Sequence, residues 1–245
     1  MLNYLVDFFD LILPNSCLSC DKILEKGDKY ICNKCFLELK LTDYHLYKYN
    51  ELYQTLFKKT DIKMAFSYLF YIEDNPIQEL IHSMKYKNRY KIAIFLGELY
   101  GKILKIDLDY IHFDLIIPIP LHNNRKKTRG YNQSEYICLG LNKYLNSIVD
   151  TETIVRKKNT KSLTLKGSEE RIKEIKGAFE ILKPENLKDK NILLVDDVIT
   201  TGSTISECAN EIKKKVQCNI YICSIARTNN CKKLNYKKKN SFYKL

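Results

Sequence analysis

Glycine and proline are scarce in this sequence and tryptophan is absent: the 245 residues include 8 glycines and 5 prolines. No Gly-Lys-Ser or Gly-Lys-Thr follows a predicted strand, which excludes the phosphate loop of Walker-type nucleotide-binding proteins. The one small-residue loop after a strand, residues 200–204, holds a single glycine, which excludes a dinucleotide-binding fingerprint. No basic segment precedes the apolar residues 2–13, so we expect neither a signal peptide nor a bilayer-spanning segment.

Acidic residues are outnumbered by basic ones. Lys and Arg total 41 against 29 Asp and Glu, a formal net charge of +12. This excess predicts a polyanionic partner, while the abundance of Lys, Asn, Ile and Tyr leaves a general compositional bias as a second interpretation. The hydrophobic content of 45% is that of a globular protein with one or two domains. Nine cysteines without a signal peptide indicate a reducing, cytoplasmic setting.

Residues 191–204 are the most informative stretch. An apolar run of strand length, Ile192 to Val195, is followed by two carboxylates, Asp196 and Asp197. A loop rich in hydroxyl groups comes next, and a helical pattern follows it. Such a junction presents unpaired backbone N–H groups and the positive end of the helix dipole to an anion. The alternative is a solvated strand end with an ordinary helix cap.

Acids placed directly before an anion-binding loop favour a sugar phosphate as the ligand. The stretch resembles the phosphoribosyl pyrophosphate (PRPP) motif of type I phosphoribosyltransferases. We expect Asp196 and Asp197 to act on the ribose hydroxyls, directly or through Mg²⁺, and to be the catalytic pair if transfer occurs. The 5′-phosphate is expected to contact the residues that follow: Val198, Thr200, Thr201, Gly202, Ser203 and Thr204.

Two Cys-x-x-Cys pairs lie near the start of the chain. The pairs, Cys17/Cys20 and Cys32/Cys35, are separated by eleven residues. Each pair can direct two thiolates to one centre, and two pairs complete a closed tetrahedral site. The spacing predicts structural zinc, with a redox-active Cys-x-x-Cys as the alternative.

A second apolar strand, residues 114–121, ends in prolines and leads into a basic loop. We expect this part of the chain to face pyrophosphate, with a solvated basic loop and helix end as the alternative. The residues concerned are Pro118, Ile119, Pro120, Arg125 and Arg129, joined by Lys85 at the end of an earlier helix. Residues 157–176 are polar and basic, as in a loop that closes over a charged ligand.

The pattern as a whole predicts an α/β fold: a mostly parallel, phosphoribosyltransferase-like sheet with helices on both faces, preceded by a small four-Cys zinc module. Strands are expected near residues 114–119, 153–156, 192–195 and 219–225. The predicted divisions are an amphipathic helix at 1–13, the zinc module at 14–40, a connector and hood-like region at 41–110, the phosphoribosyltransferase-like domain at 111–230, and a basic tail at 231–245.

These pieces in this order resemble the ComF family, zinc-finger and phosphoribosyltransferase-like proteins associated with competence. The resemblance rests on the four cysteines, on Ile81 to Tyr86, on Pro118 to Pro120, on Arg129 to Ser134, on Gly177 to Phe179 and on Val195 to Thr204. One departure concerns the loop at 157–176, where Leu163 and Glu174 replace the Gln and Asn usual in the family.

The resemblance implies a cytoplasmic protein of natural transformation that handles incoming single-stranded DNA. It also implies a PRPP–Mg²⁺ pocket and a link to the DNA translocation machinery at the inner face of the membrane. DNA is expected on the zinc module, on residues 156–166 and on the tail, where basic and aromatic residues alternate. Two alternatives remain: an active phosphoribosyltransferase acting on an unknown nitrogenous base, and a PRPP-sensing regulator.

Overall fold

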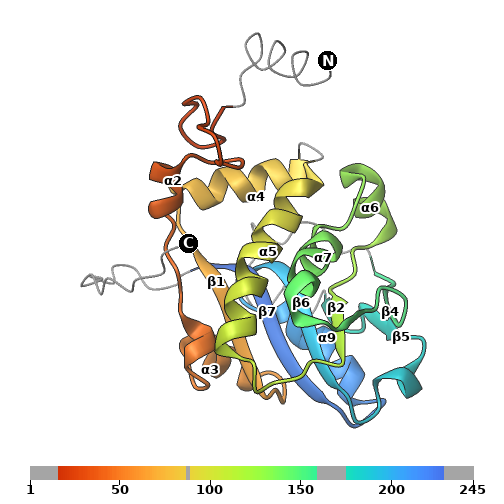
Figure 1. Cartoon of the computed structure of the whole chain (residues 1–245). Coiled ribbons are helices and arrows are strands. Elements are labelled where there is room, and N and C mark those ends of the chain that lie inside the picture. The colour runs from red at the N-terminus through yellow and green to blue at the C-terminus, as the bar shows by residue number, and fades with distance from the viewer. Residues whose placement is uncertain (1–15, 87–88, 159–174, 229–245) are drawn as a thin grey trace, which may run out of the picture.

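The computed structural model describes residues 16–86, 89–158 and 175–228. Its centre is a five-stranded sheet in the order β1-β7-β6-β2-β3, and every neighbouring pair is parallel (Figure 1). The strands are β1 (Met64–Tyr71), β2 (Leu115–Pro118), β3 (Ile148–Val149), β6 (Asn191–Ile199) and β7 (Asn219–Thr228). The predicted α/β fold with a parallel sheet is therefore confirmed.

The central strand β6 is buried on both faces and pairs with a strand on each side. Residues Ile192 to Val195 are completely buried, as in a strand covered on both faces. Leu193 lies opposite Ile116 of β2 on one side and Tyr221 of β7 on the other. The strand continues four residues beyond the predicted end at Val195, so both carboxylates lie within β6 itself.

Helices cover both faces of the sheet. In Figure 1, α5 and α7 cross in front of the strands and α9 lies behind them. The helices are α2 (Asn33–Leu37), α3 (Glu51–Phe57), α4 (Pro76–Tyr86), α5 (Tyr90–Asp107), α6 (Asn123–Arg129), α7 (Gln133–Leu145) and α9 (Ser203–Lys213), with 3₁₀ turns η1 (Tyr44–Leu46) and η3 (Pro184–Leu187). None of the described helices has the length and apolarity needed to cross a membrane.

Glycine allows α5 and α7 to cross in backbone contact. A Cβ atom at Gly140 would lie 2.2 Å from the carbonyl oxygen of Ile94, and one at Gly97 would lie 2.4 Å from that of Ile137. Neither position can hold a larger residue unless the helices separate. The crossing fixes the start of α7, which lies beside the carboxyl end of β2.

The prediction that residues 153–156 join the main sheet was wrong. Strand β4 (Ile154–Arg156) pairs antiparallel with β5 (Phe179–Ile181) in a separate two-stranded sheet. Only Ile154 of its three residues is buried, whereas a strand inside a parallel sheet is apolar on both faces. The edge positions of the main sheet are filled instead by β1 and β3.

Residues before and after the expected domain boundary at residue 110 belong to the same five-stranded sheet, because β1 pairs with β7 at seven positions. The predicted zinc module joins this body through Lys40, whose backbone carbonyl accepts a hydrogen bond from the N–H of Phe70 in β1 at 2.8 Å, and through Tyr30, whose ring packs 5.3 Å from that of Phe95. The expected helix at 1–13, the tail at 231–245 and residues 159–174 of the expected loop lie outside the described residues. Those assignments stay predictions.

Candidate functional site

A cavity of about 330 Å³ opens at the carboxyl ends of β6 and β2. The chain leaves these neighbouring strands in opposite directions, through α9 to β7 and through α7 to β3. A crevice at such a reversal of strand order is the usual ligand position in parallel α/β sheets. The lining consists of Lys85, Tyr86, Ile119, Leu121, Arg125, Arg129, Gln133, Ser134, Arg156, Asp196, Asp197, Val198, Ile199, Thr200, Thr201, Gly202, Ser203, Thr204 and Ile205.

The two carboxylates lie in the middle of the cavity and have different partners. Asp197 forms an ion pair with Lys85, with 3.0 Å between Oδ2 and Nζ, and accepts a hydrogen bond from the backbone N–H of Val198. Asp196 accepts hydrogen bonds from the backbone N–H of Asp197, at 2.9 Å, and from the hydroxyl of Ser134, at 3.4 Å. Burial and then the charge of Asp197 raise the pKa of Asp196 to about 7.

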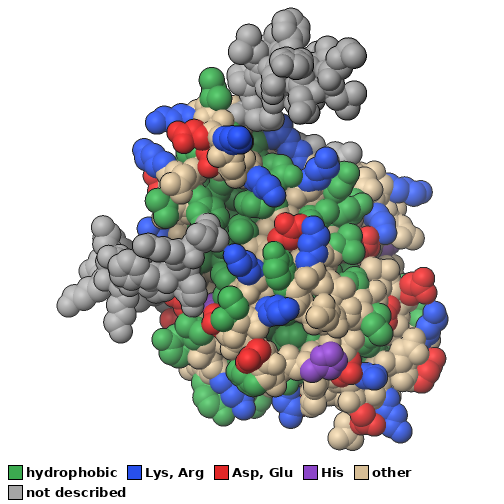
Figure 2. All heavy atoms as spheres, viewed as in Figure 1, with side chains coloured by type: hydrophobic (Ala, Val, Ile, Leu, Met, Phe, Trp, Pro, Cys, Tyr) green, Lys and Arg blue, Asp and Glu red, His purple; other side chains and the backbone are tan. Residues whose placement is uncertain are grey.

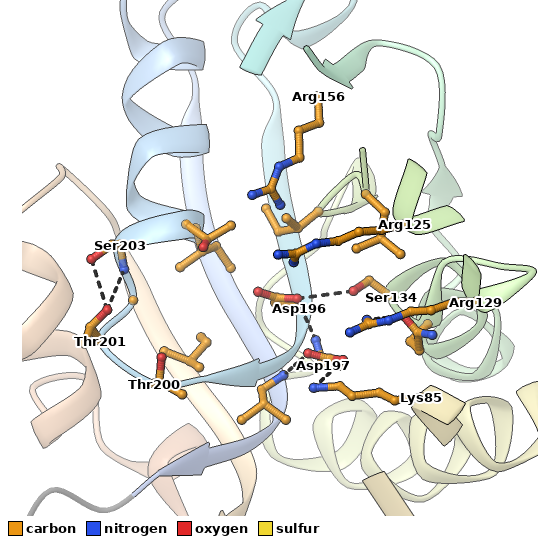
Figure 3. Close-up of a pocket in the computed structure, with 18 of the residues that line it drawn as sticks. Lys85, Arg125, Arg129, Ser134, Arg156, Asp196, Asp197, Thr200, Thr201 and Ser203 are labelled. Carbon is orange, nitrogen blue, oxygen red and sulfur yellow. Dashed lines mark hydrogen bonds and ion pairs between the residues drawn. The ribbon is translucent and has the colours of Figure 1, made fainter. Parts of the chain in front are cut away.

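The loop after β6 closes one side of the cavity. Gly202 adopts φ +73 and caps α9, so the backbone turns directly from strand to helix. The hydroxyls of Thr201 and Ser203, two of the lining residues, lie 3.0 Å apart and form a hydrogen bond with each other (Figure 3). Backbone N–H groups at the first turn of α9 and these hydroxyls together form a site for a phosphate group.

Two residues of the preceding region support this loop from outside. Lys59 donates a hydrogen bond from its ammonium group to the carbonyl of Thr201. Leu56 of α3 packs so closely that a Cβ atom on Gly202 would lie 2.2 Å from its Cδ2 atom. Neither residue was predicted to support the site, since nothing in the sequence relates residues 56–59 to a loop more than 140 positions later.

Cationic side chains close the opposite side of the cavity. Figure 3 shows Arg125, Arg129, Arg156 and Lys85 extending toward the two aspartates from the side away from Thr201. Burial, and then the charge of Arg125, lower the pKa of Arg156 to about 10. Burial, and then the charge of Arg129, lower the pKa of Arg125 as well. These guanidinium groups lie close enough together for each to disfavour the charge of the other. Such a group of cations favours binding of an anion that carries several negative charges.

The basic segment after β2 is a helix rather than the expected loop. Residues 123–129 form α6, which begins where the side chain of His122 accepts a hydrogen bond from the backbone N–H of Asn124 and ends at Gly130, with φ +80. The four-residue spacing of Arg125 and Arg129 places both side chains on one face of this helix. Histidine is not among the residues usually found at a helix N-cap, so the sequence of residues 122–129 indicated a loop.

Most of the expected ligand-binding residues line the cavity, and two do not. Pro118 and Pro120 are absent from the lining, although Ile119 between them belongs to it. The backbone N–H of Ile119 donates to the carbonyl of Val195, so the prolines end strand β2 without facing the ligand space. Four further lining residues were not predicted as site residues: Tyr86, Gln133, Ser134 and Arg156. Arg156 was expected only on a DNA surface.

The cavity therefore has three parts with different chemistry. A helix N-terminus with hydroxyl groups is on one side, four cations are on the other, and two carboxylates lie between them. Four positive and two negative side chains leave a positive balance for a ligand that carries several negative charges. This donor set fits a phosphorylated sugar with a second phosphate or pyrophosphate group, together with a hard divalent cation at the carboxylates.

The four cysteines of the predicted zinc site lie together in the structure. All four Sγ atoms are within 4.8 Å of one another, and those of Cys20 and Cys32 are 3.7 Å apart. Zn–S bonds of about 2.3 Å in a tetrahedron require sulfur atoms about 3.8 Å apart. The cluster therefore fits a tetrahedral metal ion such as Zn²⁺, and it leaves no position open for a reacting ligand.

Comparison with known proteins gives matches of three kinds: a family model, solved structures and curated relatives. Residues 144–244 match the family model described as "Phosphoribosyl transferase domain". A solved adenine phosphoribosyltransferase from Saccharomyces cerevisiae is 14% identical, with a TM-score of 0.35 over 56% of this chain and 68% of that chain.

Curated relatives are similar over a larger part of the chain. Competence protein F of Haemophilus influenzae is 31% identical over 162 residues, covering 64% of this chain and 69% of that protein. DNA utilization protein YhgH of Shigella flexneri is 30% identical over 62% of this chain and 68% of that protein. Competence protein ComFC of Bacillus subtilis is 24% identical over 81% of this chain and 78% of that protein. With these relatives and the four-cysteine cluster ahead of a phosphoribosyltransferase-like sheet, the chain belongs to the ComF family.

Proposed function

We propose that this protein handles incoming single-stranded DNA in the cytoplasm during natural transformation and binds PRPP with Mg²⁺ in its phosphoribosyltransferase domain. The observation that carries the proposal is the three-part cavity, in which the acid pair lies between a phosphate-binding loop and a group of four cations. Relatives named for competence and for DNA utilization support the biological setting.

Each part of the cavity has a role in holding the ligand. The 5′-phosphate would accept hydrogen bonds from the hydroxyls of Thr201 and Ser203 and from backbone N–H groups at the start of α9. The carboxylates of Asp196 and Asp197 would hold the ribose hydroxyls and the Mg²⁺ bound to them. Mg²⁺ held there would neutralise part of the charge on the pyrophosphate. Arg125, Arg129, Arg156 and Lys85 supply the remaining positive charge.

Single-stranded DNA and PRPP would be separate ligands of the protein. The net charge of +12 supports contact with a polyanion, and such contact would be strongly salt-dependent. The expected link to the translocation machinery belongs to the same proposal. Transfer of the phosphoribosyl group to a base is not part of the proposed function, because the three-part cavity accounts for PRPP binding without an acceptor.

The PRPP site is tested by replacing both carboxylates. We expect Asp196→Asn combined with Asp197→Asn to abolish the heat of binding in a calorimetric titration with PRPP and Mg²⁺, because amides neither balance the cation nor accept as strongly from hydroxyls. Asp109→Asn, at an exposed position after α5, is the matched control and should titrate like the wild type. Unchanged PRPP affinity in the double variant would contradict the site.

Transfer is tested separately by measuring pyrophosphate release from PRPP across a panel of nitrogenous bases. Binding without release supports a ligand-responsive DNA-handling protein. Release with one base would establish the alternative predicted from the sequence, an active phosphoribosyltransferase.

A further inference from the structure

A basic and aromatic surface borders the mouth of the cavity, where the end of α4 meets α6. Figure 2 shows Lys and Arg side chains over α6 at the upper right of the molecule. We call this surface the rim and define it by His82, Tyr86, Arg89, Tyr90, Lys126 and Arg129. Of these six residues, only Arg129 has a role in the proposed PRPP site, as one of the cavity cations.

Ring contacts join the aromatic part of the rim to Arg129, while Arg89 and Lys126 adjoin this part along the chain, Arg89 directly before Tyr90 and Lys126 within α6. The ring of Tyr86 lies 5.0 Å from that of His82 and 5.7 Å below the guanidinium group of Arg129. Tyr131, in the loop after α6, contacts α4 and α5, since its hydroxyl donates to the carbonyl of Met84 and its ring lies 6.2 Å from that of Tyr90. The rim is therefore held by packing between α4, α5 and the loop after α6.

Tyr86 presents a large aromatic ring to solvent at this place. It is 66% exposed although it lines the cavity. A fixed, exposed ring beside a guanidinium group is a platform on which a nucleic-acid base stacks, and it accepts any base because every base has a flat π-face. Stacking needs an unpaired strand, since bases inside a duplex are covered by their neighbours.

The charges of the rim favour the same partner. Arg89, Lys126 and Arg129 contribute three positive groups against one carboxylate, Glu135, which pairs with Lys126 at 3.2 Å, so the excess is two positive charges. The zinc module offers no comparable excess. Its described residues, 16–40, carry five lysines against four carboxylates, and four thiolates with Zn²⁺ would add two negative charges. A polyanion is therefore attracted to the rim more than to the zinc module.

We propose that the rim is a contact surface for single-stranded nucleic acid, with Tyr86 as a stacking platform and Arg89 and Lys126 as contacts to phosphates. This inference rests on the proposed handling of single-stranded DNA and names a place on the chain where the strand binds. The strand would cross the mouth of the cavity, beside the ligand held by Asp196 and Asp197.

The stacking role is tested by fluorescence anisotropy with a labelled thymidine oligonucleotide and the full-length protein. We expect Tyr86→Ala to weaken binding about 5- to 150-fold, the range for losing one stacked base, and Tyr86→Phe to bind like the wild type. Tyr110→Ala is the matched control, because Tyr110 is 72% exposed at a site away from the rim. Circular dichroism and thermal unfolding establish that each variant is folded.

The phosphate contacts are tested by the salt dependence of the same titration. Replacing Arg89 and Lys126 together by Gln should reduce the slope of log affinity against log salt by about 1.4, since each contact to a single strand contributes about 0.7. Lys102→Gln with Lys143→Gln is the control; Lys143 is a surface lysine with a glutamate partner, Glu98, as Lys126 has Glu135. This control pair should leave the slope unchanged.

The outcomes separate the rim from the wider proposal. Oligonucleotide binding by the wild type with equal affinity in Tyr86→Ala and in the Arg89/Lys126 variant would overturn the rim and leave DNA handling standing. Failure of the wild type to bind any oligonucleotide at low salt would overturn DNA handling itself, and the rim with it. Equal losses in the rim variants and in their controls would show a non-specific charge or folding effect and would also overturn the rim.

Discussion

The ammonium group of Lys59 donates a hydrogen bond to the backbone carbonyl of Thr201, 142 residues later in the chain. The side-chain amide of Asn210, in α9, donates in turn to the carbonyl of Lys59 at 3.1 Å. The ammonium group of Lys59 is partly shielded from water where it meets the loop, and this burial lowers its pKa. The turn before β1 therefore holds both the loop and the helix that form the phosphate side of the cavity.

Replacing Lys59 by Met should weaken PRPP binding about ten-fold while the protein stays folded. The methionine keeps the aliphatic packing but removes a charged hydrogen bond, an interaction worth about 1.5–3 kcal/mol. Isothermal titration calorimetry with PRPP and Mg²⁺ measures the effect. Lys58→Met, at the exposed neighbouring position, should bind like the wild type, and equal affinities in the two variants would show that Lys59 does not position the loop.

The contrast between Lys59 and Asp196 shows what the sequence reveals about the site. Strand, acids, loop and helix are consecutive in residues 191–213, so local patterns were enough to predict that side of the cavity. The contacts from Lys59 and Leu56 depend on α3 packing beside a loop that is distant in sequence. No periodicity or motif contains that information, because it arises only when the sheet is assembled.

Asp196→Asn should stabilise the protein, and increasingly so as the pH rises. The pKa of Asp196 is about 7 in the folded protein against 3.8 for the free group, so the folded state binds the proton more tightly. Ionisation therefore costs folding free energy between about pH 4 and pH 7, up to about 4 kcal/mol at about 1.4 kcal/mol per pKa unit. An amide at this position cannot ionise and avoids that cost.

Urea unfolding of the wild type and of Asp196→Asn at several pH values measures this difference. The gap in unfolding free energy should be small near pH 4, widen through pH 7 and then stay constant. Asp109→Asn serves as the exposed control, with no widening expected. A gap that is independent of pH would mean that Asp196 titrates normally in the folded protein.

Gly140→Ala should destabilise the protein by about 1–3 kcal/mol, the usual cost of overpacking. The added methyl group would lie 2.2 Å from the carbonyl oxygen of Ile94, so α5 and α7 would have to separate. Urea unfolding at neutral pH measures the change. Lys102→Ala, at an exposed position on α5, should change stability by less than about 0.5 kcal/mol. A similarly small effect at Gly140 would show that the helices separate at little cost.

Strand β4 shows why the fold was predicted less accurately than its central motif. Residues 153–156 have the composition of a strand, but a run this short does not specify its partner. Its pairing with β5 depends on residues 179–181, and one edge of the main sheet is formed by β3, which has only two residues. Strand existence was predictable here, whereas strand pairing depended on tertiary context.

Cys17→Ser should remove zinc from the protein and lower its solubility. A hydroxyl replaces one of four thiolates whose sulfur atoms lie within 4.8 Å of one another, and structural zinc sites stabilise the folded state directly. Metal content by plasma mass spectrometry should fall from one Zn²⁺ per chain to a small fraction of that. Asn33→Ala, an exposed position between Cys32 and Cys35, should retain the metal, and full zinc content in Cys17→Ser would refute the four-sulfur site.

PRPP and single-stranded DNA should weaken each other's binding. Tyr86 and Arg129 belong both to the cavity lining and to the rim, so the two ligands would compete for these side chains. A bound pyrophosphate would also reduce the positive potential at the cavity mouth, which attracts the strand.

Linkage requires the effect to be reciprocal: the factor by which saturating PRPP–Mg²⁺ lowers DNA affinity must equal the factor by which DNA lowers PRPP affinity. Anisotropy titrations with and without PRPP measure the first factor, and calorimetry with and without oligonucleotide measures the second. Inorganic pyrophosphate with Mg²⁺ should produce most of the effect if charge at Arg129 is the cause, whereas ribose 5-phosphate should produce little. Independent binding of PRPP and DNA would mean that the strand does not cross the mouth of the cavity.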